Sequence, residues 1–377
     1  MTAPTRSAAP LGDLPALLRD EPGLTRALGD PTARLAVVEV ARPIAIAALA
    51  TLSSRRPLVV ACPTGTMAGQ LADDIAQFLP PGDVVHFPGW ETLPFERVSP
   101  SVETMGQRLD VLWRLRDSDR RPAVIVAGVR ALMQKLGPGA TTTDPIVVRS
   151  GAEVDPDALA ARLVEFGYRR EELVEHRGEF ARRGAIVDVY PSTADAPIRI
   201  DLWGDEVDRL TTFGVNDQRS IADVAEALIF PARELMPTDD VKARASELVA
   251  AEPWGREQWE RLAEGAHFDG MESWLQWLVD GGPTGSGTLL TDVLPDAAKL
   301  VLVEPRRMRD RAIDLIAEED DLARTLASTW ARDPDRTFPR LHAEPDTLLS
   351  GSGAFWSIDS TPESPDIPVV EASGWGP

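Results

Sequence analysis

The sequence predicts an α/β protein whose parallel sheet is interrupted by a smaller inserted domain with an antiparallel sheet. Strand-like and helix-like segments alternate from Leu35 to about Ala127, which is typical of parallel strands joined by helices. Three short alternating runs separated by turn residues follow between Glu179 and Ser220, as in a small antiparallel sheet. A buried-type strand then reappears at Leu300–Glu304. We therefore expect the last part of the chain to rejoin the first sheet.

The first part of the α/β domain is predicted to span residues 1–145. Short apolar runs rich in β-branched residues indicate its strands, and longer segments with helical periodicity indicate its helices. The predicted strands are Leu35–Val40, Leu58–Ala61, Val84–Phe87 and Ala123–Ala127, and the predicted helices are Leu11–Leu28, Ile44–Leu52, Ala68–Leu79 and Val102–Arg116.

The inserted domain is predicted to span residues 146–231. Its helix is expected at Asp155–Phe166, and its strands at Ala185–Tyr190, Pro197–Trp203, Val207–Phe213 and Val224–Phe230. Side chains alternate along a strand, so Arg199, Asp201 and Trp203 share the face opposite the aliphatic one. If the aliphatic face is buried, an arginine and a tryptophan lie together in solvent. Both residue types are enriched at binding hot spots, so this face is predicted to be a docking surface.

The second part of the α/β domain is predicted to span residues 232–332, and residues 333–377 are predicted to be an irregular linker. The glycine-rich segment 281–287 is also predicted to be a linker. The predicted helices are Asp239–Ala251, Arg256–Glu264, Met271–Val279 and Arg306–Ala331.

Composition limits the possible functions. The 377 residues carry a net charge of −21, which disfavours a duplex-DNA clamp because such a surface needs clustered cations. No run of apolar residues is long enough to span a membrane. Cys62 is the single cysteine, so no internal disulfide can form, which favours a reducing, cytoplasmic location.

The search for catalytic chemistry is negative. A phosphate-binding loop needs a glycine-rich turn followed by lysine and serine or threonine, and the turn after Leu58–Ala61 contains Gly65 and Gly69 but no lysine. A magnesium-binding strand would end in Asp-Glu, and here Val303 precedes Glu304. The four histidines show no ligand spacing. We predict no catalytic residue, no metal and no cofactor.

Four segments of the sequence resemble a known family. The segment GEFARRGAIVDVYP, with PIRIDLWGDEVDRLTTFGVNDQRS after it, resembles a region shared by the excision-repair protein UvrB and the transcription-repair coupling factors. The segment FPGWETLP and the later ALMQ are similar to the coupling factors in particular. The resemblance covers residues 35–330. It implies a split domain with a degenerate P-loop, helicase-like fold and a small inserted domain that binds the damage sensor UvrA.

The resemblance also implies roles for particular residues. It implies that Arg183, Arg199 and Trp203 contact UvrA, although the family often has phenylalanine at the last position. Gly65, Gly69 and Glu304 would be the remains of a nucleotide site. Modules for RNA polymerase binding and ATP-driven DNA translocation would lie beyond Pro377.

Three hypotheses follow. The first is a non-catalytic adaptor that recruits UvrA in transcription-coupled nucleotide excision repair. The alternative is an ATP-dependent repair helicase component like UvrB, which the missing lysine disfavours. A DNA-binding module is the third, and the acidic balance disfavours it.

Overall fold

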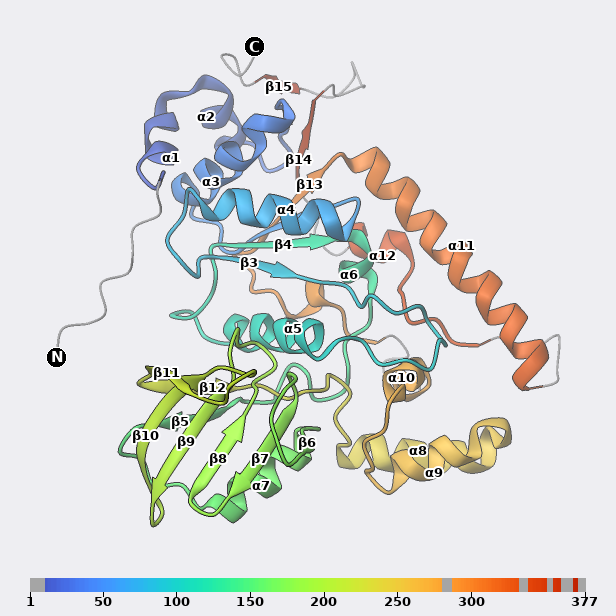
Figure 1. Cartoon of the computed structure of the whole chain (residues 1–377). Coiled ribbons are helices and arrows are strands. Elements are labelled where there is room, and N and C mark those ends of the chain that lie inside the picture. The colour runs from blue at the N-terminus through green and yellow to red at the C-terminus, as the bar shows by residue number, and fades with distance from the viewer. Residues whose placement is uncertain (1–10, 280–286, 332–337, 351–354, 361–368, 372–377) are drawn as a thin grey trace. The chain divides into compact units, whose positions relative to one another are not determined.

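The computed structural model describes residues 11–279, 287–331, 338–350, 355–360 and 369–371 (Figure 1). Its contacts divide the chain into two compact units, each built from separate segments. Unit 1 comprises residues 1–89, 114–135 and 286–377, and unit 2 comprises residues 90–113 and 136–285. The predicted domain limits at residues 145, 231 and 332 stay a prediction. Among the described residues no helix is both long and apolar enough to cross a membrane.

Unit 1 contains a parallel sheet, as the sequence predicts. Seven strands of the described residues form it in the order β15-β1-β14-β13-β2-β4-β3, and every neighbouring pair is parallel. The central strands are buried along their whole length, because helices of this architecture cover both faces. Their bounds are β1 Arg34–Ala36, β2 Leu58–Cys62, β3 Val84–Phe87, β4 Val124–Gly128, β13 Lys299–Val303, β14 Trp356–Asp359 and β15 Val369–Glu371.

The last part of the chain rejoins this sheet, which confirms the predicted topology. Strand β13 pairs with β2, with Lys299 opposite Leu58. The predicted irregular linker at 333–377 needs correction, because β14 lies between β1 and β13 and β15 pairs with the other edge of β1. Trp356 and Ile358 are buried in the core there. The segment alternates apolar and polar residues and is flanked by Gly, Ser, Pro and Asp, so it does not show the continuous apolar run that predicts a buried parallel strand.

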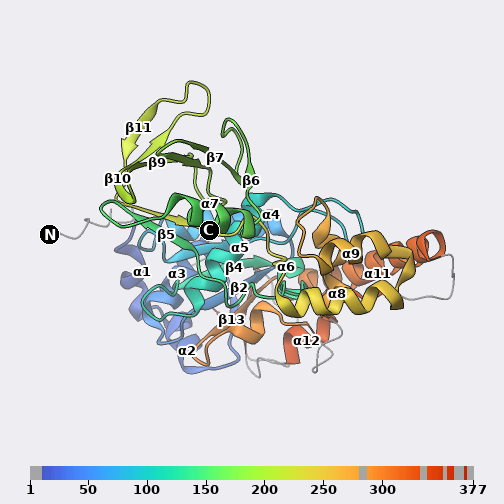
Figure 2. The same cartoon turned by 90° about the horizontal axis from the view of Figure 1, so that it is seen from below.

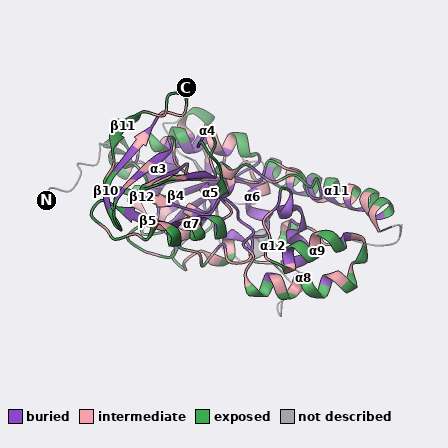
Figure 3. Cartoon of the chain, turned by 60° about the horizontal axis from the view of Figure 1, so that its bottom comes forward, coloured by how far each residue is buried: buried purple, intermediate pink, exposed green. Residues whose placement is uncertain are grey.

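Helices complete unit 1. The helices α2, α3 and α4 share one apolar core with alternate residues of the sheet. The long helix α11 buries one stripe, including Met308, Ala312 and Leu315, and exposes its other side (Figure 3). The bounds are α1 Leu14–Leu17, α2 Pro22–Gly29, α3 Arg42–Leu52, α4 Gly65–Ala76, α6 Val129–Met133, α11 Pro305–Trp330 and α12 Pro345–Ser350.

Unit 2 contains the antiparallel sheet. Six strands of its described residues follow the order β11-β10-β9-β8-β7-β6, antiparallel except for the β6–β7 pair, and β5 and β12 form a separate pair (Figure 1 and, from below, Figure 2). Helix α7, Pro156–Glu165, packs its Leu159 and Leu163 into the core of this sheet. The strands are β5 Ile146–Arg149, β6 Arg169–Arg170, β7 Glu179–Arg183, β8 Ile186–Val189, β9 Ile198–Trp203, β10 Glu206–Phe213, β11 Ser220–Asp223 and β12 Glu226–Ile229.

Helices also belong to unit 2. They are α8 Asp239–Ala251, α9 Arg256–Ala263, α10 Leu275–Val279 and most of α5, Val102–Leu115. Four tryptophans pack together in the α8–α10 region, with ring centroids of Trp259 and Trp274 4.7 Å apart. Helix α5 is held by Arg108, whose Nε donates to Glu234 Oε2 at 2.6 Å, and neither side chain is exposed. The described residues 232–279 therefore belong to the same compact unit as the antiparallel sheet.

Candidate functional site

Strand β9 alternates as the sequence predicts. Ile198, Ile200 and Leu202 are buried in the core of unit 2, while Trp203 is 81% exposed. Together with Arg199 and Asp201 it belongs to the opposite face of the strand, which we call the outer face. The apolar half of the pattern and the exposed tryptophan are confirmed.

The strand register also places Arg183 on the outer face. Arg183 lies opposite Ile186, which lies opposite Asp201. Residues directly opposite each other in a sheet point to the same side. Arg183, Arg199 and Trp203 therefore come from two strands to one face, with Arg199 and Trp203 roughly 13 Å apart along β9, at about 3.3 Å per residue.

Asp188 joins the two arginines. Its Oδ2 accepts from Arg183 Nη2 at 2.6 Å and from Arg199 Nη2 at 2.9 Å, and its Oδ1 accepts from Arg199 Nε at 2.7 Å. The Asp188 side chain is only 1% exposed. Sequence reasoning missed this carboxylate. The available signal was a lone aspartate in an apolar strand, Ile186 to Val189, but pairing it with Arg199 requires the register of β8 against β9.

Arg199 is much less exposed than its strand position implies. Its side chain is 16% exposed, since its Nη1 donates to the Gln218 carbonyl oxygen at 3.1 Å and its guanidinium lies 4.7 Å from the Phe213 ring centroid. The hydrogen bonds to Asp188 raise the pKa of Arg199. The expectation that Arg199 stands in solvent beside Trp203 is therefore wrong. The loop after β10 covers it.

A second ion pair lies on the same sheet. Arg209 Nε is 2.5 Å from Asp223 Oδ1, and both side chains are more than half exposed. Arg209 pairs with Asp201 across β9 and β10, so it also belongs to the outer face. The hydrogen bond between the two raises the pKa of Arg209 and lowers that of Asp223. Like Asp188 with its two arginines, this is a carboxylate–guanidinium pair, but both of its side chains are exposed.

In unit 1, the residues expected to be remains of a nucleotide site lie at the carboxyl ends of adjacent strands. Gly65 begins α4 directly after β2, where Thr64 Oγ1 accepts from the Met67 amide at 3.2 Å. Gly69 lies one turn further along α4. A Cβ on Gly128, at the end of β4, would lie 2.8 Å from the Gly65 nitrogen. Backbone therefore occupies the space beside the first amide of the loop.

Glu304 follows the neighbouring strand β13 and is held by arginines. Its Oε1 accepts from Arg42 Nη1 at 2.8 Å, and Arg307 contacts its other oxygen. Arg42 is 2% exposed and also donates to Ser360 Oγ. Burial opposes the charge of Glu304, but the hydrogen bonds and charges of Arg42 and Arg307 outweigh it and lower the pKa. The Glu304 carboxylate is thus ion-paired with two arginines of the chain.

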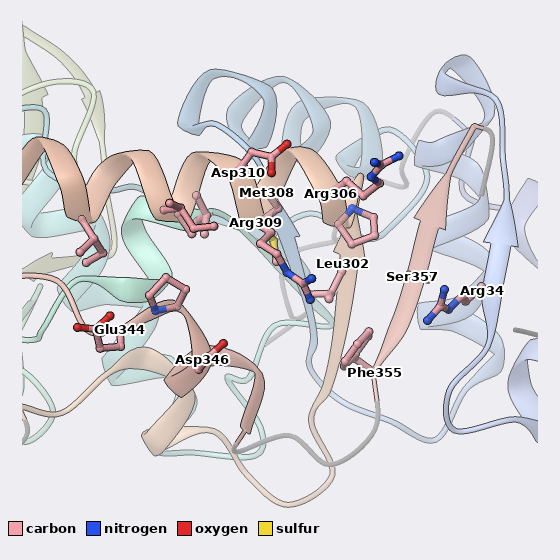
Figure 4. A pocket seen from close by; sticks show the side chains of 16 residues that line it. Arg34, Leu302, Arg306, Met308, Arg309, Asp310, Glu344, Asp346, Phe355 and Ser357 are labelled. Carbon is pink, nitrogen blue, oxygen red and sulfur yellow. The ribbon is translucent and has the colours of Figure 1, made fainter. Parts of the chain in front are cut away.

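A groove of about 620 Å³ also opens in unit 1, between the first half of α11, α12 and β14 (Figure 4). Leu302, Met308 and Phe355 contribute apolar surface to it, and Arg34 and Arg309 line it as well. None of the site residues predicted from the sequence is among the residues that line it.

Comparison with known proteins places this region in a known domain family. The model of the UvrB interaction domain matches residues 146–235, which include every outer-face residue named above. A transcription-repair-coupling factor of Mycobacterium tuberculosis is 37% identical over 353 residues, which cover 88% of this chain and 28% of the relative. The corresponding factor of Bacillus subtilis is 30% identical over 305 residues, 76% of this chain and 25% of the relative.

A UvrABC system protein B of Pseudothermotoga lettingae is 30% identical over 208 residues, 52% of this chain and 32% of the relative. The chain thus spans about a quarter to a third of the length of these relatives. Its split α/β unit and antiparallel sheet agree with the architecture that the resemblance implied. The chain carries a UvrB interaction domain and is, over most of its length, a homologue of the DNA-repair proteins called transcription-repair-coupling factors.

Proposed function

We propose that this chain is a non-catalytic adaptor module that recruits UvrA in transcription-coupled nucleotide excision repair. The observation that carries the proposal is Trp203, 81% exposed on the same sheet face as Arg183, within the matched interaction domain. A large aromatic side chain left in solvent on the same face as a cation is typical of a binding hot spot. The expected cytoplasmic location belongs to this proposal.

The outer face is suited to an acidic partner surface with an apolar socket. Arginine and tryptophan each contribute on the order of 2 kcal/mol or more when they become buried at the centre of an interface. The strands that carry them are held by the buried core beneath, so little backbone ordering is needed on binding. We propose Arg183, Arg199 and Trp203 as the residues on which UvrA binding depends.

The test is titration of the chain with UvrA by calorimetry. Trp203→Ala and Arg183→Ala should each weaken binding at least tenfold, roughly 1.4 kcal/mol, while Arg209→Ala, the matched arginine of the exposed pair, should change it less than about threefold. Wild-type affinity in both Trp203→Ala and Arg183→Ala would refute the assignment.

We further propose that this chain hydrolyses no ATP, and that a longer parent protein supplies ATP-driven DNA translocation and RNA polymerase binding. The support is the lysine-free turn at Gly65 and the pairing of Glu304 with Arg42. A charge held this way cannot organise magnesium without breaking a buried ion pair. Measurable ATP hydrolysis, or a rise in thermal midpoint with Mg-ATP, would instead support the UvrB-like ATPase.

A further inference from the structure

We propose that Asp188 and Arg199 are positioning residues that hold the guanidinium of Arg183 toward a carboxylate of the partner. This inference rests on the proposed function, because it concerns the same outer face. In this proposal Arg183 contacts the partner, and Arg199 holds Arg183 in position.

The hydrogen bonds of Arg199 are directed into the protein. Nε and Nη2 donate to Asp188, Nη1 donates to the Gln218 carbonyl, and the guanidinium lies over Phe213. Phe213 itself is buried with Val174 and Ala181 in a small second core on this side of the sheet. Most donor directions of Arg199 are thus already used within the chain, and only 16% of its side chain is exposed to a partner.

Arg183 is arranged in the opposite way. Its side chain is 48% exposed, and the structure pairs it with Asp188 through Nη2 alone. In the described part of the chain its Nε–H and Nη1–H groups have no protein acceptor. They are the donors that remain for a carboxylate outside the chain.

Asp188 determines the charge and the direction of the cluster. One carboxylate, 1% exposed, is shared by two permanently charged guanidinium groups, so the three side chains carry one net positive charge. Because Arg199 is enclosed, that excess is presented at Arg183. An arginine held before binding also loses less side-chain entropy when the partner docks, which slows dissociation more than it speeds association.

The test is a double-mutant cycle with the full 377-residue chain and immobilised UvrA, read by association and dissociation rates. Asp188→Asn and Arg199→Lys should each raise the dissociation rate roughly tenfold and change the association rate less than about threefold. In the Arg183→Ala background each should add less than about twofold. Asp223→Asn, which removes the carboxylate of the exposed pair on the same sheet, should behave like wild type.

The outcomes separate the two claims. If Asp188→Asn and Arg199→Lys keep their full effect in the Arg183→Ala background, they act by another route and the inference is overturned. The same holds if Arg183→Ala weakens binding while both supporting variants dissociate at the wild-type rate; the proposed function then stands. Wild-type binding by Arg183→Ala and Trp203→Ala overturns the proposed function itself. Thermal midpoints check folding, and if Asp188→Asn does not fold, the cycle is decided by Arg199→Lys, which retains the charge.

Discussion

Burial changes the chemistry of single side chains in this protein, and Cys62 is the plainest case. It ends β2 with no exposed surface, and burial raises the pKa of its thiol to about 12, against the opposing charge of Arg42. The thiolate is the reactive form of cysteine, so the folded chain holds this thiol in its inert state.

Alkylation should reveal this inertness. At pH 8 the native chain should resist iodoacetamide, whereas the urea-unfolded chain should react, as mass spectrometry would record. Above pH 9.0 the thiol ionises in the unfolded chain but stays protonated in the folded chain, where its pKa is about 12. The free energy of unfolding is therefore unaffected by this thiol below pH 9.0 and falls as the pH rises toward about 12. Free energies of unfolding between pH 9 and 11 should therefore fall less steeply in Cys62→Ala. Rapid alkylation of native protein at Cys62 would contradict the assigned burial.

Glu304 is the residue on which the buried Arg42 depends. Replacement by alanine should lower the free energy of unfolding by about 3 kcal/mol or more, because it leaves a cation without its carboxylate. Glu318→Ala, on the exposed side of the helix α11 that follows Glu304, is the matched control and should lower it by less than about 1 kcal/mol. Urea unfolding would measure both. Equal effects would mean that Arg42 finds another acceptor.

Residue patterns predict the outer face only in part. The alternation of Ile198 to Trp203 is a local property, so the sequence was sufficient to predict the buried row and the exposed Trp203. The burial of Arg199 depends on Gln218, almost twenty residues away, and the role of Asp188 depends on register. Neither property can be predicted from the alternation of side chains along a single strand.

At the scale of elements, α5 illustrates how a buried ion pair ties distant segments together. Arg108 of α5 and Glu234, from the segment after β12, are both fully buried, and Trp90 Nε1 also donates to Glu234 at 2.9 Å. The helical period of 102–116 predicts the helix correctly, but charged residues on it suggest solvent. The pairing explains why α5 packs with unit 2.

Removing the carboxylate should loosen this element. Glu234→Ala should destabilise unit 2 by about 3–5 kcal/mol, since Arg108 would remain buried and charged. Glu226→Ala breaks the exposed pair with Arg149 and should change stability by less than about 1 kcal/mol. Tryptophan fluorescence during denaturation would report both. Similar midpoints for the two variants would show that Arg108 is not dependent on Glu234.

At the scale of the whole molecule, the sheet of unit 1 is made from both ends of the sequence. Strands β14 and β13 lie between β1 and β2, so the first two strands of the chain are not neighbours. The reappearance of an apolar strand at 300–304 was sufficient to predict the return of the chain. Strand β14 could not be predicted in this way, because Ser357 and Asp359 interrupt it and it lacks the continuous apolar run by which the other buried strands are predicted.

Truncation of the chain at residue 285 should affect the two units differently. It lacks β13 and β14, so β2 should lose its slow amide exchange, while unit 2 keeps all its segments and should still bind UvrA. Hydrogen-exchange mass spectrometry and the binding titration together check this. Undiminished protection of β2 would show that its pairing with β4 alone is sufficient.

The interleaved sheet also sets an order of events during synthesis. Arg34 pairs with Ser357, roughly 320 residues later, so at translation rates of roughly 5–20 residues per second β1 waits on the order of 15–65 s for its neighbour. All segments of unit 2 leave the ribosome before β13 does. A nascent chain can thus display the outer face while the first strand still has an open edge, which is the stage at which a chaperone would be most needed.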